Sequence, residues 1–444
     1  MWQGWIARLW SQVSSQHLPA GLLAVGGSTG GEKKDAGGQK PGSGAGGGRK
    51  ISGGFFSSLG SGAVVVAAFA MLSGLLLLSY VLLTYNRTIA LPAHPLLTRL
   101  MMARLSFNNQ APTDGPYVCM SNCFYWNPAV VFHRGHHLIA VRESTKSHCG
   151  GLKILQTAGV LLFRSAFNSV LVGTVDEFTP GVTEATLSWR VPNGQLPGDG
   201  KAHFGFEDPR WVVQGDDLFL LVHREMRDRP TVFLARVLQV EPSLELGPCV
   251  HLKSVHGDGW PEKNWMHIPH QAPGDARLLF VNSLDPLEIL ATDPSTGKSS
   301  MVYAQNGTGR AYWGHRLSGS TPFIATSGLL LAGDERAAFF GLAHARQDHP
   351  LFGFGFGAYV LYLARIALLD DGSWRLTVGD MFNLPTDESD ASKRINFPTT
   401  VIETPERPGE FLVSLGEMDC TSHVVSLEKS GVLSLVNNMR QQVY

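Results

Sequence analysis

Short apolar runs separated by turn residues recur from about Ser106 to Tyr444. Hairpin signals such as Arg134-Gly135, Gln214-Gly215-Asp216 and Asp370-Asp371-Gly372 connect several of these runs. Because long stretches of helical periodicity are scarce, the pattern predicts many short strands, arranged as a propeller or as a large sandwich. Five four-stranded blades of about 65 residues each fit the length. The clearest runs are Ala129–Phe132, His137–Arg142, Trp211–Val213, Leu218–His223, Arg277–Asn282, Ala337–Ala343, Tyr359–Leu369, Phe411–Leu415 and His423–Leu427.

A different pattern precedes this region. Ala63–Tyr85 is apolar and carries no charge, and its length of about 23 residues matches the roughly 30 Å hydrocarbon core of a bilayer. Lysines and arginines gather before it, which predicts an uncleaved signal-anchor with the N-terminus in the cytosol and the C-terminal part in the lumen. The predicted organisation is a disordered, glycine-rich tail at 1–62, the anchor at 63–85, a stem at 86–105 and a catalytic domain at 106–444.

The composition excludes some functions and leaves others open. The formal net charge of −1 gives no reason to expect a nucleic-acid partner. The five cysteines, at 119, 123, 149, 249 and 420, are too few and too scattered for a disulfide scaffold or a zinc ribbon, although Cys119 and Cys123 are close enough to bridge. No metal-binding motif is present, so we expect neither a metal nor another cofactor. A phosphate or a sugar nucleotide would be a co-substrate.

The most informative motif is Glu207-Asp208-Pro209-Arg210. Pro209 cannot donate to a sheet ladder and disfavours a helical conformation at Asp208, so we expect an extended Asp208 at a strand entrance. A rigidly held carboxylate beside a cation is a candidate catalytic acid. The alternative is a turn closed by a surface pair of Asp208 and Arg210.

Two further groups of residues have side chains that suit the binding of a sugar or of an anion. Amides, guanidinium groups and carboxylates bind sugar hydroxyls well, and such groups follow or precede strands at Asn127, Arg142 and Asp419. A second group of cationic and amide side chains fits an anion, either a phosphate or a nucleotide diphosphate: Lys263, Asn264, Arg316 and His344. Taken singly, Asn127 and Arg142 are equally well explained as an ordinary turn residue and a solvated arginine. Lys263 alone is better explained as a surface lysine, and each other residue is weak evidence by itself.

Read in order, these segments resemble glycoside hydrolase family 130, a group of five-bladed propellers that includes β-mannoside phosphorylases and β-1,2-mannosyltransferases. The matching pieces span nearly all of residues 120–425. They are Asn127-Pro128-Ala129, Val141-Arg142, Phe206-Glu207-Asp208-Pro209-Arg210, Lys263-Asn264-Trp265, Arg316 with the following Ser-Gly-Ser-Thr-Pro, His344, Phe397-Pro398, and Gly416 with Asp419.

The resemblance implies a role for each group. Asp208 would be the single catalytic acid, with Glu207 and Arg210 beside it in the substrate site. Asn127, Arg142 and Asp419 would hold the mannosyl ring, and Lys263, Asn264, Arg316 and His344 would bind the anion. The chain departs from the family pattern at this anion site, and the loop before His344 is lengthened, so the identity of the anion stays open.

The membrane anchor is foreign to the cytosolic phosphorylases and suits an enzyme of the Golgi or endoplasmic reticulum. We therefore expect an inverting glycosyltransferase that adds β-mannosyl residues to a glycan acceptor. The alternatives are a β-mannoside phosphorylase or hydrolase, and a non-catalytic propeller that binds carbohydrate.

Overall fold

The computed structural model describes residues 69–77, 79, 94–112, 123–144, 168–192, 205–226, 229–241, 244–256, 264–270, 274–306, 317–349, 353–384, 396–417 and 421–439. The predicted tail at 1–62 lies outside these residues, as does most of the predicted anchor. Residues 69–77, within the anchor, are helical. No helix among the described residues is both long enough and apolar enough to span a bilayer.

The described chain is almost entirely β-structure, as the pattern of short apolar runs predicts. The runs named above fall on strands, except that Arg277 lies one residue before its strand. The hairpin signals fall at turns: Arg134 and Gly135 have φ angles of 51° and 86°, as a tight two-residue hairpin requires. The elements are β1 (Arg99–Asn109), β2 (Phe124–His133), β3 (His136–Ser144), β4 (Asn168–Val175), β5 (Gly181–Arg190), β6 (Glu207–Gln214), β7 (Asp217–Met226), β8 (Arg229–Gln239), β9 (Glu245–Leu246), β10 (Val250–His251), β11 (Met266–Ile268), β12 (Leu278–Leu284), β13 (Leu287–Thr292), β14 (Ser299–Ala304), β15 (Leu317–Gly319), β16 (Glu335–His349), β17 (Gly353–Leu369), β18 (Trp374–Phe382), β19 (Asn396–Ile402), β20 (Glu410–Glu417), β21 (Thr421–Glu428) and α4 (Lys429–Met439).

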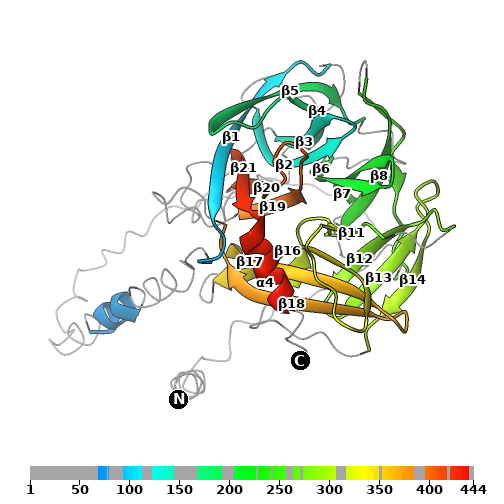
Figure 1. Cartoon of the computed structure of the whole chain (residues 1–444). Coiled ribbons are helices and arrows are strands. Elements are labelled where there is room, and N and C mark those ends of the chain that lie inside the picture. Colours follow the sequence, from blue (N-terminus) through cyan, green and yellow to red (C-terminus); the bar gives the residue numbers. More distant parts are fainter. Residues whose placement is uncertain are drawn as a thin grey trace, which may run out of the picture. The chain divides into compact units, whose positions relative to one another are not determined.

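The strands divide into five antiparallel groups of four, which we call blades 1 to 5. Blade 1 is β2 to β5, blade 2 is β6 to β8 with β10, blade 3 is β11 to β14, blade 4 is β15 to β18, and blade 5 is β19 to β21 with β1. In Figure 1 the blades follow one another in chain order, from cyan through green and yellow to red. This arrangement is consistent with the predicted five-bladed propeller.

The first strand completes the last blade. β1 pairs antiparallel with β21 and, on its other side, parallel with β5, so blades 5 and 1 are joined in one hydrogen-bonded sheet. Because β1 begins at Arg99, the folded region extends into the range 86–105 that was predicted to be a stem. Long-range pairing decides this, since β1 finds its partners about 80 and 320 residues further along the chain.

The hydrophobic core is divided among the contacts between successive blades. Within the described part of the chain, five clusters of buried apolar side chains lie between blades 1 and 2, 2 and 3, 3 and 4, 4 and 5, and 5 and 1. The inner strands of the blades therefore bury both of their faces, as β12 and β20 do, which explains why their runs are apolar almost throughout rather than alternating. The first strands of blades 1, 2 and 5 also contact one another, so their residues meet at a common centre.

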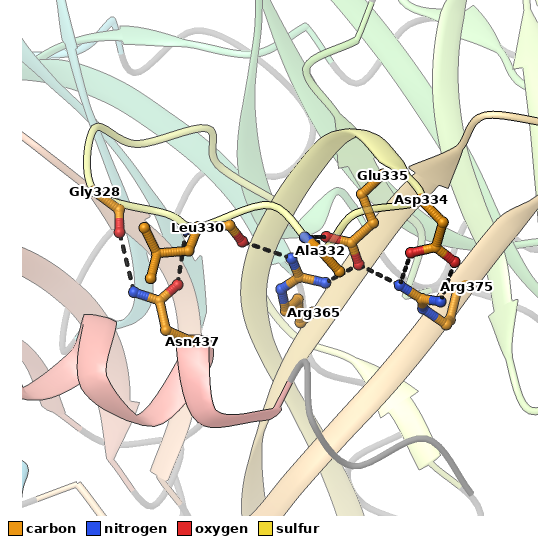
Figure 2. A network of polar contacts seen from close by, with 8 residues as sticks. All are labelled: Gly328, Leu330, Ala332, Asp334, Glu335, Arg365, Arg375 and Asn437. Carbon is orange, nitrogen blue, oxygen red and sulfur yellow. Dashed lines mark hydrogen bonds and ion pairs between the residues drawn. The ribbon is translucent and has the colours of Figure 1, made fainter.

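The segment that leads into β16, which was predicted to contain a lengthened loop, is held by a network of ion pairs and hydrogen bonds, shown in Figure 2. Nη1 and Nη2 of Arg365 each donate to the Glu335 carboxylate at 2.6 Å, and Arg375 donates to the same carboxylate at 2.6 Å. Arg365 also donates to the Leu330 carbonyl, and Asn437 on α4 bonds the backbone of the same loop. The loop therefore has a structural role, holding blade 4 against α4.

Candidate active site

The innermost strands of blades 1 and 2 carry matching irregularities at Asn127 and Asp208. Each residue precedes a proline, and each lies where the strand's register shifts. Their φ angles are 53° and 49°, in the left-handed region. The expectation of an extended Asp208 is therefore wrong, although Glu207 does open a strand as predicted. Asn and Asp tolerate this region better than other non-glycine residues, and a bulge re-aims the side chain that it carries.

These two bulges bring the side chains of Asn127 and Asp208 together. The Asn127 amide donates to Asp208 Oδ1 at 2.7 Å. Both residues are buried, with Asp208 4% and Asn127 3% exposed. Gly416 on β20 makes room for this pair, because a Cβ atom at that position would lie 1.9 Å from Asn127 Oδ1. Blades 1, 2 and 5 thus cooperate in placing one carboxylate.

Arg142 on β3 joins the same group from the neighbouring strand. Its Nη1 donates to Asp208 Oδ1 at 3.2 Å, and its Nη2 pairs with Glu207 Oε2 at 2.8 Å. The guanidinium carbon lies 5.1 Å from the centre of the Trp126 ring, and Nε donates to Asn168. We call Asn127, Arg142, Glu207 and Asp208 the Asp208 cluster.

The geometry at Asp208 separates its two carboxylate oxygens. Oδ1 accepts hydrogen bonds from both Asn127 and Arg142, and neither donor can accept a proton in return. A proton on this carboxyl group would therefore sit on Oδ2. The cluster orients Asp208 so that one defined oxygen exchanges protons, which is what a general acid or base needs.

A second group surrounds Arg210, two residues further along β6. Its Nε donates to the Ser320 carbonyl at 2.5 Å, and its Nη2 donates to Asn264 Oδ1 at 3.3 Å. The Ser320 hydroxyl lies 2.7 Å from His344 Nδ1. The guanidinium carbon is 5.5 Å from the centre of the Phe397 ring, which also packs against His344. We call Arg210, Asn264, Ser320 and His344 the Arg210 cluster.

Arg210 is a costly residue to bury. It is fully buried, and burial lowers the pKa of its guanidinium to about 10, although the nearby charge of Asp208 opposes this fall. Nη1 has no hydrogen-bond partner among the described residues. A buried cation with an unmatched donor is the arrangement that an anionic ligand would complete.

The site residues predicted from the sequence fall into two groups, apart from those that lie outside the described residues. It brings together Asn127, Arg142, Glu207 and Asp208 as one group, and Asn264 and His344 as another. Arg210, which we expected beside the sugar, contacts the anion group instead, while remaining within reach of the Asp208 charge. Lys263, Arg316 and Asp419 lie outside the described residues, so their predicted roles stay predictions.

Ser320 was not among the predicted site residues, although it lies in the Ser-Gly-Ser-Thr-Pro segment that carried the family resemblance. Its carbonyl and hydroxyl connect Arg210 to His344, a link between blades 2 and 4 that no local pattern indicates. Among the described residues no group of three or more His, Cys, Asp and Glu side chains is arranged to hold a metal ion.

Comparison with known proteins gives no family assignment from sequence. No family model and no curated protein matches the chain. Among solved structures, a β-1,2-mannobiose phosphorylase from Listeria innocua has 15% identity and a TM-score of 0.46, covering 71% of this chain and 92% of its own. A mannose phosphorylase from Leishmania mexicana has 11% identity and a TM-score of 0.41, covering 75% and 89%. An exo-1,5-α-L-arabinanase from a bovine ruminal metagenomic library has 11% identity and a TM-score of 0.40, covering 68% and 92%.

Proposed function

We propose that the chain is a carbohydrate-active enzyme that breaks or forms a β-mannosidic bond with inversion. Asp208 is its acid–base residue, and an anion beside Arg210 is the second reactant. The observation that carries this proposal is the pairing of one oriented carboxylate with a buried, incompletely satisfied guanidinium on the same strand. Asp208 is the better placed of the two carboxylates in its cluster, because Asn127 and Arg142 both hold its Oδ1, whereas Glu207 pairs with Arg142.

Phosphorolysis is the reaction that these groups support best. A phosphate oxygen attacks C1 of the mannosyl group from one face while the bond from C1 to the glycosidic oxygen breaks on the other. Asp208 gives the proton on Oδ2 to the departing oxygen, either directly or through a sugar hydroxyl. The products are an alcohol and α-mannose 1-phosphate, because a single displacement inverts C1. In the reverse direction Asp208 takes up the proton of the acceptor hydroxyl.

The Arg210 cluster suits a compact anion. Arg210 is 0% exposed and His344 4% exposed, so the anion would bind in a largely desolvated place, where charge-assisted hydrogen bonds are strong. Arg210 Nη1 would donate to it. The Ser320 hydroxyl holds the His344 ring in position at Nδ1. Lys263 and Arg316 are proposed to complete the site.

A second candidate is transfer of a mannosyl group from a sugar nucleotide to a glycan in the lumen of the secretory pathway. The predicted signal-anchor at 63–85 favours it. The disulfide formed by Cys123 also favours it, because disulfides persist in oxidising compartments. Only Cys123 and Cys249 are described and Cys249 is free, so the partner of Cys123 lies outside the described residues.

Product analysis separates the two reactions. The full chain in detergent is incubated with β-1,2-mannobiose and phosphate, and separately with GDP-mannose and a panel of mannose-terminated acceptors. Release of α-mannose 1-phosphate only in the first reaction supports phosphorolysis, and GDP release with a lengthened glycan supports transfer. Release of free mannose without dependence on phosphate would identify a hydrolase. Absence of turnover in every reaction, with a folded protein, would contradict an enzymatic function.

A further inference from the structure

Blade 5 contains a second polar site, separate from the two clusters just described. A hollow of about 680 Å³ lies along β1 and β21, near the start of β5. This volume falls within the range of about 300–1,000 Å³ that is typical of small-molecule sites. Its polar lining includes Arg99, Arg104, Glu417, Thr421 and His423.

The hollow and the Asp208 cluster lie on opposite faces of β20. Successive residues of a strand point to opposite sides of the sheet. The position of Gly416 faces Asn127, so the next residue, Glu417, faces away from the Asp208 cluster and lines the hollow. A ligand in the hollow would therefore be distinct from one held by Asp208.

The polar residues of the hollow form a continuous row across three strands. Glu417 on β20 is paired in register with Thr421 on β21, and His423 on β21 is paired with Arg104 on β1. Directly opposed residues project from the same face, as do residues two apart on one strand. Glu417, Thr421, His423 and Arg104 thus share one face, with a carboxylate at one end and a guanidinium at the other.

At the inner end of this row the side chains of His423 and Glu417 are buried in contact with each other. His423 Nε2 lies 3.1 Å from Glu417 Oε2, and each side chain is 7% exposed. The Thr421 hydroxyl lies 3.0 Å from His423 Nε2 and 3.3 Å from Glu417 Oε2. His423 Nδ1 has no hydrogen-bond partner among the described residues. This hydrogen-bonded group supplies the carboxylate and hydroxyl oxygens in the wall of the hollow.

The outer end is cationic and partly apolar. Arg99 and Arg104 are exposed, and the Arg104 side chain makes no ion pair with another described residue. Met102, two residues before Arg104, adds an apolar wall on the same side. Hydroxyl-binding groups at one end, a cation next to them and an apolar wall beyond the cation match a sugar that carries an acidic group.

We propose that the hollow binds an anionic sugar, with its phosphate or carboxylate group against Arg104 and its hydroxyl groups against Glu417 and Thr421. The site is independent of the reaction at Asp208 and gives the protein a second carbohydrate contact. The hollow would make the enzyme prefer glycans that carry an acidic sugar at a distance from the bond that reacts.

Titration calorimetry on the full chain tests this assignment. The probes are mannose 6-phosphate, glucuronate, mannose and inorganic phosphate, and the background is Asp208→Asn so that no probe is consumed. We expect one of the two acidic sugars to bind more tightly than both mannose and inorganic phosphate, and the comparison of the two identifies the acidic group. Arg104→Ala should weaken binding about tenfold, the effect of losing one charge-assisted hydrogen bond, and Arg104→Lys should restore part of it.

Two control variants make the result specific. Arg210→Met removes the guanidinium of the Arg210 cluster and should leave the binding of the acidic sugar unchanged. Arg236→Ala removes an exposed arginine of blade 2 that pairs with Asp217, and it should also leave this binding unchanged. Equal affinity in the wild-type hollow and in Arg104→Ala would overturn the proposal, as would a loss of binding only in Arg210→Met. Because Arg104 is exposed, its variants should fold even if changes at the buried Glu417 do not.

Discussion

Replacing Arg210 by methionine distinguishes a ligand-binding arginine from a structural one. Methionine fills a similar volume but carries no charge. Removing a structural arginine from a buried ion pair destabilises the fold by about 3–5 kcal/mol, because its partner is left buried and unpaired. If Arg210 instead binds an anion, its buried charge destabilises the fold while no anion is bound. Removing the charge would then remove this unfavourable free energy.

The magnitude follows from the burial of Arg210. The fall of its pKa to about 10, caused by desolvation and opposed by Asp208, corresponds to about 3 kcal/mol at roughly 1.4 kcal/mol per pH unit. Against this relief stand two hydrogen bonds from the guanidinium, to Ser320 and Asn264, each worth about 1–2 kcal/mol. The two contributions nearly cancel. We therefore expect Arg210→Met to change the free energy of unfolding by no more than about 1 kcal/mol in the absence of phosphate.

The assay compares urea unfolding of wild type and Arg210→Met with and without phosphate. Phosphate should stabilise the wild type by RT ln(1 + [L]/Kd), which is about 2.7 kcal/mol at a hundredfold excess over Kd, and it should not stabilise the variant. The matched control is Arg365→Met, which removes an equally buried guanidinium from the blade 4 network of Figure 2. A loss of several kcal/mol in Arg210→Met without phosphate, equal to that in Arg365→Met, would refute the reasoning.

Two other substitutions test the packing around the site and the fold that supports it. Gly416→Ala should displace Asn127 from Asp208, because the added Cβ would lie 1.9 Å from Asn127 Oδ1, and it should reduce turnover about tenfold or more while circular dichroism stays unchanged; unchanged turnover would contradict the proposed positioning. Glu335→Gln should lower the free energy of unfolding by about 3 kcal/mol at pH 7, because burial raises the pKa of this carboxyl but the hydrogen bonds from Arg365, the backbone and Arg375 outweigh it and lower the pKa to about 2. A carboxyl group with a lowered pKa stabilises the fold fully above its ordinary pKa of about 4.5, and this stabilisation is lost as the pH falls toward 2. The difference in free energy of unfolding between variant and wild type, measured in urea, should therefore be smaller at pH 3 than at pH 7. A difference that does not change with pH would contradict this origin.

The sequence predicts the strands well because their apolar runs and turn residues are local signals. It does not indicate β1, whose first residues, Arg99–Leu105, lie in the range predicted to be a stem, because only pairing with β21 and β5 makes them a strand. The neighbourhood of Asn127, Arg142 and Asp208 was expected from the family resemblance alone. The left-handed backbone at Asp208 was missed, since the proline rule favours an extended residue and the bulge overrides it.

The Arg210 cluster illustrates a second limit of prediction from the sequence. Arg210 and Asn264 come from different blades, and Ser320 and His344 from a third, so their meeting depends on how the blades pack and not on any spacing in the sequence. The sequence could indicate that cationic and amide residues recur after strands. It could not indicate which of them contact one another, or that the guanidinium of Arg210 is fully buried.

The central claim is that Asp208 donates the proton to the departing oxygen while phosphate attacks C1. Asp208→Asn tests it most directly, because asparagine keeps the tolerance for the φ of 49° and the shape of the side chain, and removes the carboxyl group that transfers the proton. The measurement is the rate of α-mannose 1-phosphate formation from β-1,2-mannobiose and phosphate, followed by proton NMR, in wild type and variant of equal thermal midpoint. We predict formation of the α-anomer by the wild type and a loss of at least about a hundredfold in the variant. Equal rates in the two proteins, or formation of the β-anomer, would contradict the account.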